Sequence, residues 1–381
     1  MSNRKLSVLA ICAVILAGWA ILQTRLSAPR EITNMVNAPL ITGLDIEAIN
    51  GIEIKSPKGS EKVKLARQSG GFVVIDKDGY PANTKSINDL ITNCLDIRTT
   101  ELCSKDPVFH EDLGVSEQTA RYVISFLDKE DKPFLTLFIS DSRPDTQNCY
   151  VRLGWSDATY LSIGSPLIRT SPIDYIDTKL TSVQTNDISS VTVVSPQQSY
   201  TLKKNVEQDQ IELENTPAGK RLAGTTYKQV FNALGDLRFE DVMAKSSQME
   251  GLKFENRYIC QMADSTVYTL ELAKKDQKTY LTVAAEFTDK TDVVKEKTVE
   301  SQQQLKGKEA RLLARDHADE FAQQHAGWVY VLPEYKAKDL TKDLSELLED
   351  IPAETGPRQQ AAKEPNQPAM PEDGGFTNEG I

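Results

Sequence analysis

The sequence predicts an α+β fold, in which two duplicated units of antiparallel sheet plus helix follow an N-terminal transmembrane helix. Three observations lead to this prediction: an apolar N-terminal run, a pattern of strands with one helix that recurs about 140 residues later, and the absence of regular strand–helix–strand alternation. At roughly 150 residues per domain, 381 residues are enough for two or three domains.

The overall charge excludes one class of partner. The chain holds 44 Lys and Arg against 55 Asp and Glu, which gives a formal net charge of −11. Affinity for phosphate backbones needs clustered cations, so we expect no nucleic-acid partner.

The first element is a membrane anchor from Leu6 to Leu22, a run without charge. At 1.5 Å per residue it spans about 25 Å, near the lower limit for crossing a bilayer. Arg4 and Lys5 precede it, and no second apolar run of comparable length follows. A cleaved signal peptide and a buried helix are the alternatives.

Residues 1–30 are therefore expected to form a cytoplasmic tip and the anchor. The basic residues on the two sides of the run nearly balance in the positive-inside count. Export of the large C-terminal part is the usual outcome for a single span near the N-terminus. We expect a single-pass protein of the inner (cytoplasmic) membrane with its C-terminal body in the periplasm.

The first unit, residues 41–175, begins with an alternating strand at Ile49–Ile54, and the second unit, residues 183–350, begins with a similar strand at Ile188–Val193. Short third strands are expected at Phe72–Ile75 and at residues 210–213. One amphipathic helix follows in each unit, where Ile87, Leu90 and Ile97 match Tyr227, Val230 and Leu237.

A hairpin and a closing strand complete each unit. The hairpin Tyr122–Leu137 runs in parallel with Tyr268–Val283, and the closing strand at Tyr160-Leu161 matches Tyr330-Val331. The matched Arg98/Arg238 and Tyr122/Tyr268 pairs are assigned to packing. A terminal helix is expected at residues 340–348.

The spacing between matches widens before Tyr330, which locates a charged helical insertion at about residues 286–327. Good helix formers dominate residues 298–324, and a narrow apolar stripe is predicted at Ala310, Leu313, His317 and Phe321. Such a helix lies on the surface of its own domain or docks a partner protein.

Residues 352–381 are rich in Pro and Gly and nearly free of apolar residues, which predicts a disordered tail. The unit boundary is expected between Pro172 and Gln184. Cys12 falls in the anchor, and the other four cysteines lack metal-type spacing, so separated buried thiols are expected, with one or two disulfides as the alternative.

No motif for chemistry is present in the sequence. The three histidines are few, and His317 and His325 are eight residues apart, unlike the four-residue spacing of HExxH. Neither a phosphate-binding glycine loop nor GxSxG occurs. We therefore expect no catalytic, cofactor or metal residues. A hydrolase with an unfamiliar site is a further hypothesis.

Several segments resemble one bacterial family, the domain of unknown function 4340. They are the run Phe72–Ile75, the end of the helix at Leu95–Ile97, the segment Asp112–Val115, the hairpin to Leu137, Tyr150–Arg152 with Tyr160-Leu161, and Gly327–Pro333. The resemblance covers roughly residues 41–349. It implies one N-terminal anchor with an exported body, and similarity in some members to the auxiliary part of gliding-motility-type ABC transport systems.

The expected function is that of a membrane-anchored extracytoplasmic accessory protein without catalysis, an auxiliary component of an ABC-type transport or cell-envelope system. Its partners would be the membrane, through the N-terminal helix, and the permease and ATPase subunits of a transporter. The alternative is a stand-alone envelope module that captures a ligand between its repeats, or acts as a scaffold.

Overall fold

The computed structural model describes residues 37–59, 61–68, 70–205, 207–245, 251–291 and 301–351. The expected anchor at Leu6–Leu22 and the expected tail at residues 352–381 lie outside the described residues. None of the helices within these described ranges is long and apolar enough to cross a membrane.

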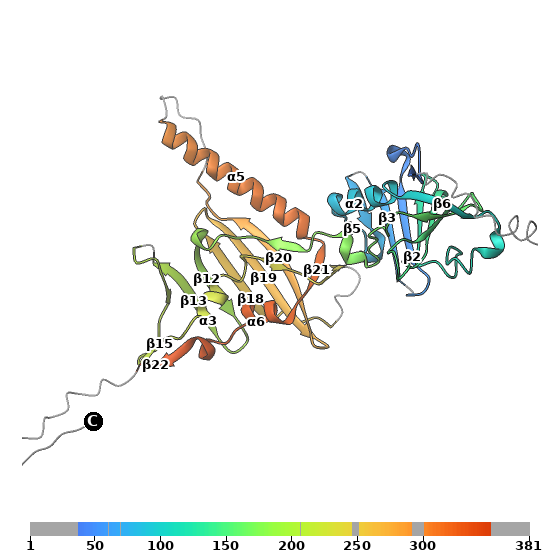
Figure 1. Ribbon diagram of the computed structural model, residues 1–381. Coiled ribbons are helices and arrows are strands. Elements are labelled where there is room, and N and C mark those ends of the chain that lie inside the picture. The colour runs from blue at the N-terminus through green and yellow to red at the C-terminus, as the bar shows by residue number, and fades with distance from the viewer. Residues whose placement is uncertain are drawn as a thin grey trace, which may run out of the picture.

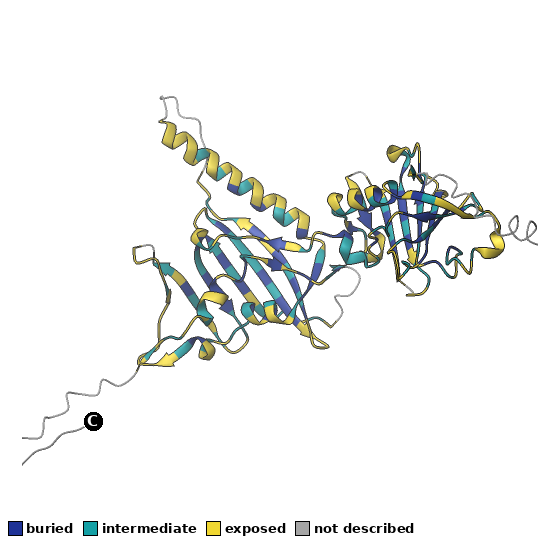
Figure 2. Cartoon of the chain, viewed as in Figure 1, coloured by how far each residue is buried: buried dark blue, intermediate teal, exposed yellow. Residues whose placement is uncertain are grey.

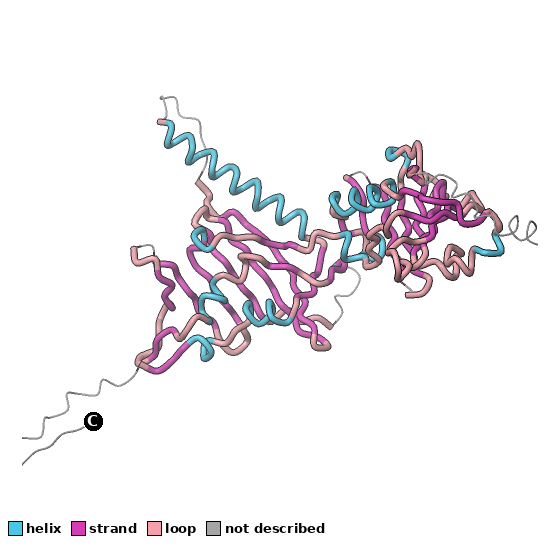
Figure 3. The backbone as a smooth tube through the Cα atoms, in the orientation of Figure 1, coloured by secondary structure: helices cyan, strands magenta, loops and turns pink. Residues whose placement is uncertain are grey.

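Antiparallel sheet dominates the fold, with few helices, as predicted (Figures 1 and 3). The first sheet has ten strands, in the spatial order β1 (Ala38–Pro39), β6 (Arg98–Ser104), β10 (Thr159–Ser162), β9 (Tyr150–Leu153), β8 (Pro133–Ile139), β7 (Tyr122–Leu127), β2 (Gly51–Ser56), β3 (Glu61–Gln68), β4 (Gly71–Val74) and β5 (Tyr80–Pro81). The second has eight, in the order β14 (Gln210–Leu213), β13 (Ser199–Asn205), β12 (Ile188–Val194), β18 (Asn256–Met262), β19 (Thr266–Lys275), β20 (Lys278–Phe287), β21 (Trp328–Leu332) and β17 (Asp241–Ala244).

The two sheets share one strand order. β2, β3 and β4 correspond to β12, β13 and β14, and the central run β7–β8–β9–β10–β6 corresponds to β18–β19–β20–β21–β17. The short pair β1 and β6 also has a counterpart, since β11 (Lys179–Thr181) pairs with β16 (Leu237–Arg238). In these pairs Pro39 lies opposite Arg98 and Lys179 opposite Arg238, so the two arginines occupy matching positions.

The sheet order corrects one sequence match. The hairpin β7–β8 corresponds to β18–β19, whereas the predicted partner of Tyr122–Leu137, Tyr268–Val283, falls on β19 and β20. The match was therefore shifted by one strand, because successive hairpins of a meander carry the same alternating pattern. Tyr122 and Tyr268 are not equivalent.

One helix packs against each sheet at the predicted place. In the first unit α2 (Thr84–Leu95) is capped by Asn83, whose side chain accepts a hydrogen bond from the Ser86 N–H, and buries Ile87, Leu90, Ile91 and Cys94. In the second unit α3 (Thr226–Phe231) buries Val230 and Phe231. Figure 2 shows the buried residues alternating along the strands of both sheets.

The C-terminal segment differs from the prediction of one helix over residues 340–348. α6 (Glu334–Leu340) ends at the first residue of that range, a 3₁₀ turn covers Leu344–Leu347, and β22 (Leu348–Asp350) pairs with β15 (Lys220–Leu222). Asp343 and Glu346 form a capping box that starts the new turn, so the helix cannot continue through this point.

The charged insertion forms α5 (Gln302–His325) in the connection between β20 and β21. In the first sheet, residues 154–158 make the equivalent connection. The predicted stripe is wrong: α5 buries Ala314, Ala318 and His325, whereas Ala310, Leu313 and His317 are exposed. Only Phe321 of the predicted stripe packs on the core. The small alanines allow the helix to approach the sheet closely.

Candidate functional site

The candidate site lies on the outer face of the first sheet. β8 is apolar on both faces: Leu135 and Leu137 enter the main core, and Phe134, Thr136 and Phe138 alternate with them on the other side. This second face also needs a cover, because a large apolar surface left in water is unfavourable.

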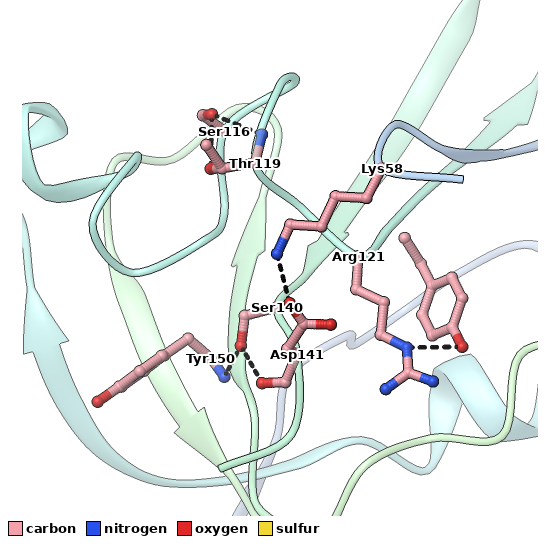
Figure 4. Close-up of polar contacts among 8 residues, drawn as sticks. Lys58, Ser116, Thr119, Arg121, Ser140, Asp141 and Tyr150 are labelled. Carbon is pink, nitrogen blue, oxygen red and sulfur yellow. Dashed lines mark hydrogen bonds and ion pairs between the residues drawn. The ribbon is translucent and has the colours of Figure 1, made fainter. Parts of the chain in front are cut away.

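The segment that leads into β7 supplies part of that cover. Its Val115 and Ala120 pack against Val123 and Phe138 to form a second, smaller core. A turn fixes the segment, since the Ser116 hydroxyl lies 2.9 Å from the Thr119 hydroxyl and accepts the Thr119 N–H at 3.2 Å (Figure 4). The turn holds Glu117 at the edge of the uncovered part of the face.

Arg152 of β9 joins the covering segment to the sheet. Its guanidinium stacks on the Phe138 ring at 4.1 Å from the centroid, and its Nε and Nη2 donate to the Val115 carbonyl at 3.1 and 3.0 Å. Nη1 donates to the carbonyls of Leu153 and Ser156. Arg152 thus links the covering segment, through Val115, to the end of β9 and to the loop that follows it.

This guanidinium is a buried cation without an ion pair in the part of the chain that the structure describes. Arg152 is 8% exposed, and its guanidinium donates four hydrogen bonds, all of them to backbone carbonyls. Burial lowers the pKa of Arg152, and the more distant Asp157 and Glu117 carboxylates offset part of this effect. An acceptor group placed beside the guanidinium would further stabilise the charge.

A cavity of about 430 Å³ opens beside Arg152. It is lined by side chains from β8, β9 and the two flanking loops: Glu117, Pro133, Phe134, Thr136, Phe138, Arg152, Gly154 and Trp155. We call this set the Arg152 groove. Trp155 is 65% exposed, which is unusual for a large apolar side chain because much of its ring stays in contact with water. Phe134, which is also exposed, lines the groove as well.

Gly154 keeps the groove compact. A Cβ at this position would lie 2.9 Å from Cβ of Thr136, and the Gly154 N–H donates to the Thr136 carbonyl at 2.7 Å. The groove combines aromatic walls with one guanidinium, one carboxylate and one hydroxyl, and its described lining includes no histidine, cysteine or lysine. These groups are suited to binding a small ligand.

A polar cluster beside the covering segment has a different role. Lys58 pairs with Asp141, and the Ser140 hydroxyl accepts the Tyr150 N–H and donates to the Asp141 carbonyl, both at 2.8 Å (Figure 4). Arg121 donates to the Tyr122 hydroxyl at 2.9 Å. Both bonds of the Ser140 hydroxyl go to backbone groups at the end of β8 and the start of β9, so they hold these strand ends together.

The contact between the two units is packed by aromatic rings. Tyr80 of β5 meets Phe239, Trp328 and Tyr330 at centroid distances of 5.9, 4.8 and 6.3 Å. Lys77 pairs with Asp241 at 2.6 Å beside them. The Arg152 groove lies within the first unit, away from this contact, so it differs from the ligand position expected between the repeats.

Comparison with known families assigns the central part of the chain. Residues 73–256 match the family model described as Domain of unknown function (DUF4340). This part of the chain belongs to the DUF4340 family. The match begins within β4, includes the whole Arg152 groove and ends at the first residue of β18. No curated protein and no solved structure matches the chain.

The two histidines of α5 that the sequence analysis compared lie in different environments. His317 is exposed and lies on α5, whereas His325 is buried with Nδ1 2.5 Å from the Tyr330 hydroxyl. In the described ranges, no group of three or more His, Cys, Asp or Glu side chains is placed to hold a metal ion. The described cysteines are free thiols: Cys94, Cys149 and Cys260 are buried, and Cys103 is exposed.

The sequence patterns did not single out the groove residues of the DUF4340 segment. Phe134 and Phe138 alternate with buried leucines, which indicates a strand covered on both faces, and Arg152 falls inside an apolar strand. Gly154-Trp155 directly after that strand places a tryptophan in a tight turn. These signals predict a covered sheet face, but only the fold shows which part of it stays open.

Proposed function

We propose that this chain is a membrane-anchored extracytoplasmic accessory protein that acts by binding, as an auxiliary component of an ABC-type transport or cell-envelope system. Leu6–Leu22 holds it in the inner membrane, and its body lies in the periplasm. The absence of nucleotide motifs from the sequence supports an external ATPase subunit. The observation that carries the binding role is the Arg152 groove, with its buried cation and exposed aromatic wall.

Isolation of the full chain from native membranes tests the proposed partners. We expect a tagged full chain in mild detergent to recover a multi-span permease and an ATPase. The control is the full chain with Tyr335→Ala. Tyr335 is an exposed tyrosine of the second unit that does not line the groove, so this variant should recover the same subunits. Recovery of the full chain alone, at native expression, would contradict the accessory role.

The groove also favours a second candidate, a stand-alone envelope module that captures a ligand. Its chemistry suits a ligand with a flat apolar face, which packs on Trp155, and with hydrogen-bond acceptors for Arg152. This candidate places the ligand within the first unit.

Thermal unfolding tests the second candidate. We expect one member of a panel of envelope saccharides and peptides to raise the melting temperature of the purified full chain, because ligand that binds only the folded state stabilises it. Trp155→Ala should abolish the shift without lowering the melting temperature of the free protein, since the ring is largely exposed. A shift that persists in Trp155→Ala, or no shift with any member, contradicts the groove as the capture site.

A further inference from the structure

The guanidinium of Arg152 keeps a free donor for a ligand in the groove. Nε and Nη2 both donate to the Val115 carbonyl, and Nη1 donates to the carbonyls of Leu153 and Ser156. Nη2 carries a second N–H at the outer end of the guanidinium, and this group has no acceptor among the described residues. Because Arg152 lines the cavity, a ligand in the groove can supply that acceptor.

The same guanidinium is held in place before any ligand arrives. Its four hydrogen bonds and its position 4.1 Å from the centroid of the Phe138 ring fix it from several sides. A group that is already in its bound position loses little conformational entropy when a ligand binds. Arg152 is therefore a preformed site for an anionic group.

Glu117 adds a charge of the opposite sign to the groove. Its side chain is exposed, and it forms no hydrogen bond or close ion pair within the part of the chain that the structure describes. It is near enough to act on the Arg152 charge. The groove thus combines a buried cation with an exposed carboxylate, and no ion pair joins the two.

This combination selects the charge of the ligand. A ligand with only a negative charge would be attracted by Arg152 and repelled by Glu117, and a ligand with only a positive charge would meet the reverse. A zwitterion satisfies both groups when its carboxylate lies beside Arg152 and its ammonium group beside Glu117. The charges of the groove therefore favour a small zwitterion.

The aromatic lining and the size of the groove define the rest of the ligand. Trp155 is 65% exposed and Phe134 is 37% exposed, and both rings offer a surface to an apolar group. The cavity of about 430 Å³ lies in the lower part of the range of about 300–1,000 Å³ for small-molecule sites. It suits a short peptide and not a long chain.

We propose that the Arg152 groove binds a short peptide that has both termini free and carries a large apolar side chain. The C-terminal carboxylate accepts from Arg152, the N-terminal ammonium group pairs with Glu117, and the apolar side chain packs on Trp155. This assignment rests on the binding role proposed above for the groove. The carboxylate contributes more than the ammonium group, because Arg152 is buried and Glu117 is exposed to water.

Four dipeptide probes test the chemistry on the purified full chain. They are Ala-Phe, its C-terminal amide, its N-acetyl derivative and Ala-Ala, and isothermal titration calorimetry measures the dissociation constant of each. We expect Ala-Phe to bind, amidation to weaken binding at least about tenfold, and acetylation to weaken it about two- to fivefold. Ala-Ala, which lacks the ring, should bind at least about tenfold more weakly than Ala-Phe. The amide takes the place of a substitution at Arg152, which would also release the covering segment.

Two glutamate variants assign the ammonium group to its partner. In Glu117→Gln, Ala-Phe and its acetyl derivative should bind equally well, whereas the loss on amidation should stay as in wild type. Glu111→Gln removes the same charge from an exposed glutamate of the covering segment that does not line the groove, so it should keep the wild-type preference. Trp155→Ala should remove the preference for Ala-Phe over Ala-Ala.

The outcomes separate this proposal from the binding role on which it rests. If a saccharide raises the melting temperature and no dipeptide binds, the groove stays a capture site and the peptide ligand is wrong. If neither class binds, both proposals fail. Binding of Ala-Phe that amidation leaves unchanged, or a preference against acetylation that persists in Glu117→Gln, would also overturn the assignment of the two termini.

Discussion

Single residues set the shape of the candidate site. Gly154 permits the turn after β9 to approach β8, and Arg152 is buried by the segment whose carbonyl it binds. Neither role is visible in the sequence, because a glycine after a strand and an arginine within one each have several ordinary explanations. Both depend on which strand lies next to β9, a fact set by long-range pairing.

Gly154→Ala tests the close approach. Its Cβ would meet Cβ of Thr136 at 2.9 Å, so the two strands must separate. We expect a loss of about 1–3 kcal/mol in the free energy of unfolding, as for other overpacked sites. Chemical denaturation of the full chain measures it. An unchanged free energy would show that the turn moves freely.

His325 gives stability a dependence on pH. Burial lowers its pKa to about 4 from 6.5, so the folded state keeps the imidazole neutral. As pH falls from 6.5 towards 4, the unfolded chain takes up the proton first, and stability is lost across this window. The loss is on the order of 2–3 kcal/mol by pH 4.

The comparison of two variants isolates this effect. His325→Asn should flatten that part of the stability profile, measured as the free energy of unfolding between pH 7 and pH 4. His317→Asn, at the exposed histidine of the same helix, should leave the profile as in wild type. Equal profiles for both variants would rule out His325 as the source.

At the scale of elements, alternation and helical periodicity predicted the fold class and about half of the strands. The strands near Ile49, Phe72 and Ile188 and the helices α2 and α3 lie where expected, because each buries a face that its own sequence defines. The terminal helix and the stripe of α5 were wrong. In both cases the sequence contains good helix formers. Packing against the sheet determines where the helix ends and which of its residues are buried.

Helix α5 yields a prediction at this scale. Gly307 lies in the N-terminal half of α5, and no neighbouring side chain or other segment lies within 4 Å of the position that a Cβ would take there. Gly307→Ala should therefore stabilise the helix by about 0.5–1 kcal/mol through the lower backbone entropy of alanine. Slower amide hydrogen exchange over residues 304–310 measures it. Exchange as fast as in wild type would mean that this half opens by another route.

At the scale of the whole molecule, two related sheets meet through Tyr80. Its ring is buried among Phe239, Trp328 and Tyr330 of the second unit. The shared strand order of the two sheets could be predicted only in outline, since a shift by one hairpin preserves the pattern of alternation. The aromatic contact left no signal in the sequence, because its members come from distant segments.

Tyr80→Ala tests the contact between the units. Removal of a buried aromatic ring should lower the free energy of unfolding by about 3–5 kcal/mol and separate the unfolding of the two units. Scanning calorimetry of the full chain should then show two transitions in place of one. Tyr335→Ala, at an exposed tyrosine, should retain the wild-type trace. A single transition in Tyr80→Ala would place the coupling elsewhere.

The most direct test of the proposed role is the side of the membrane on which the body lies. Burial and Glu101 raise the pKa of the Cys103 thiol to about 11, which makes it a slow probe, so Val108→Cys in a Cys103→Ser chain supplies a well-exposed thiol. The measurement is labelling by a membrane-impermeant maleimide. We predict labelling in intact spheroplasts and protection in sealed inside-out vesicles, with the chain resistant to carbonate extraction. Labelling only in inside-out vesicles, or release of the chain by carbonate, would contradict an anchored periplasmic binding protein.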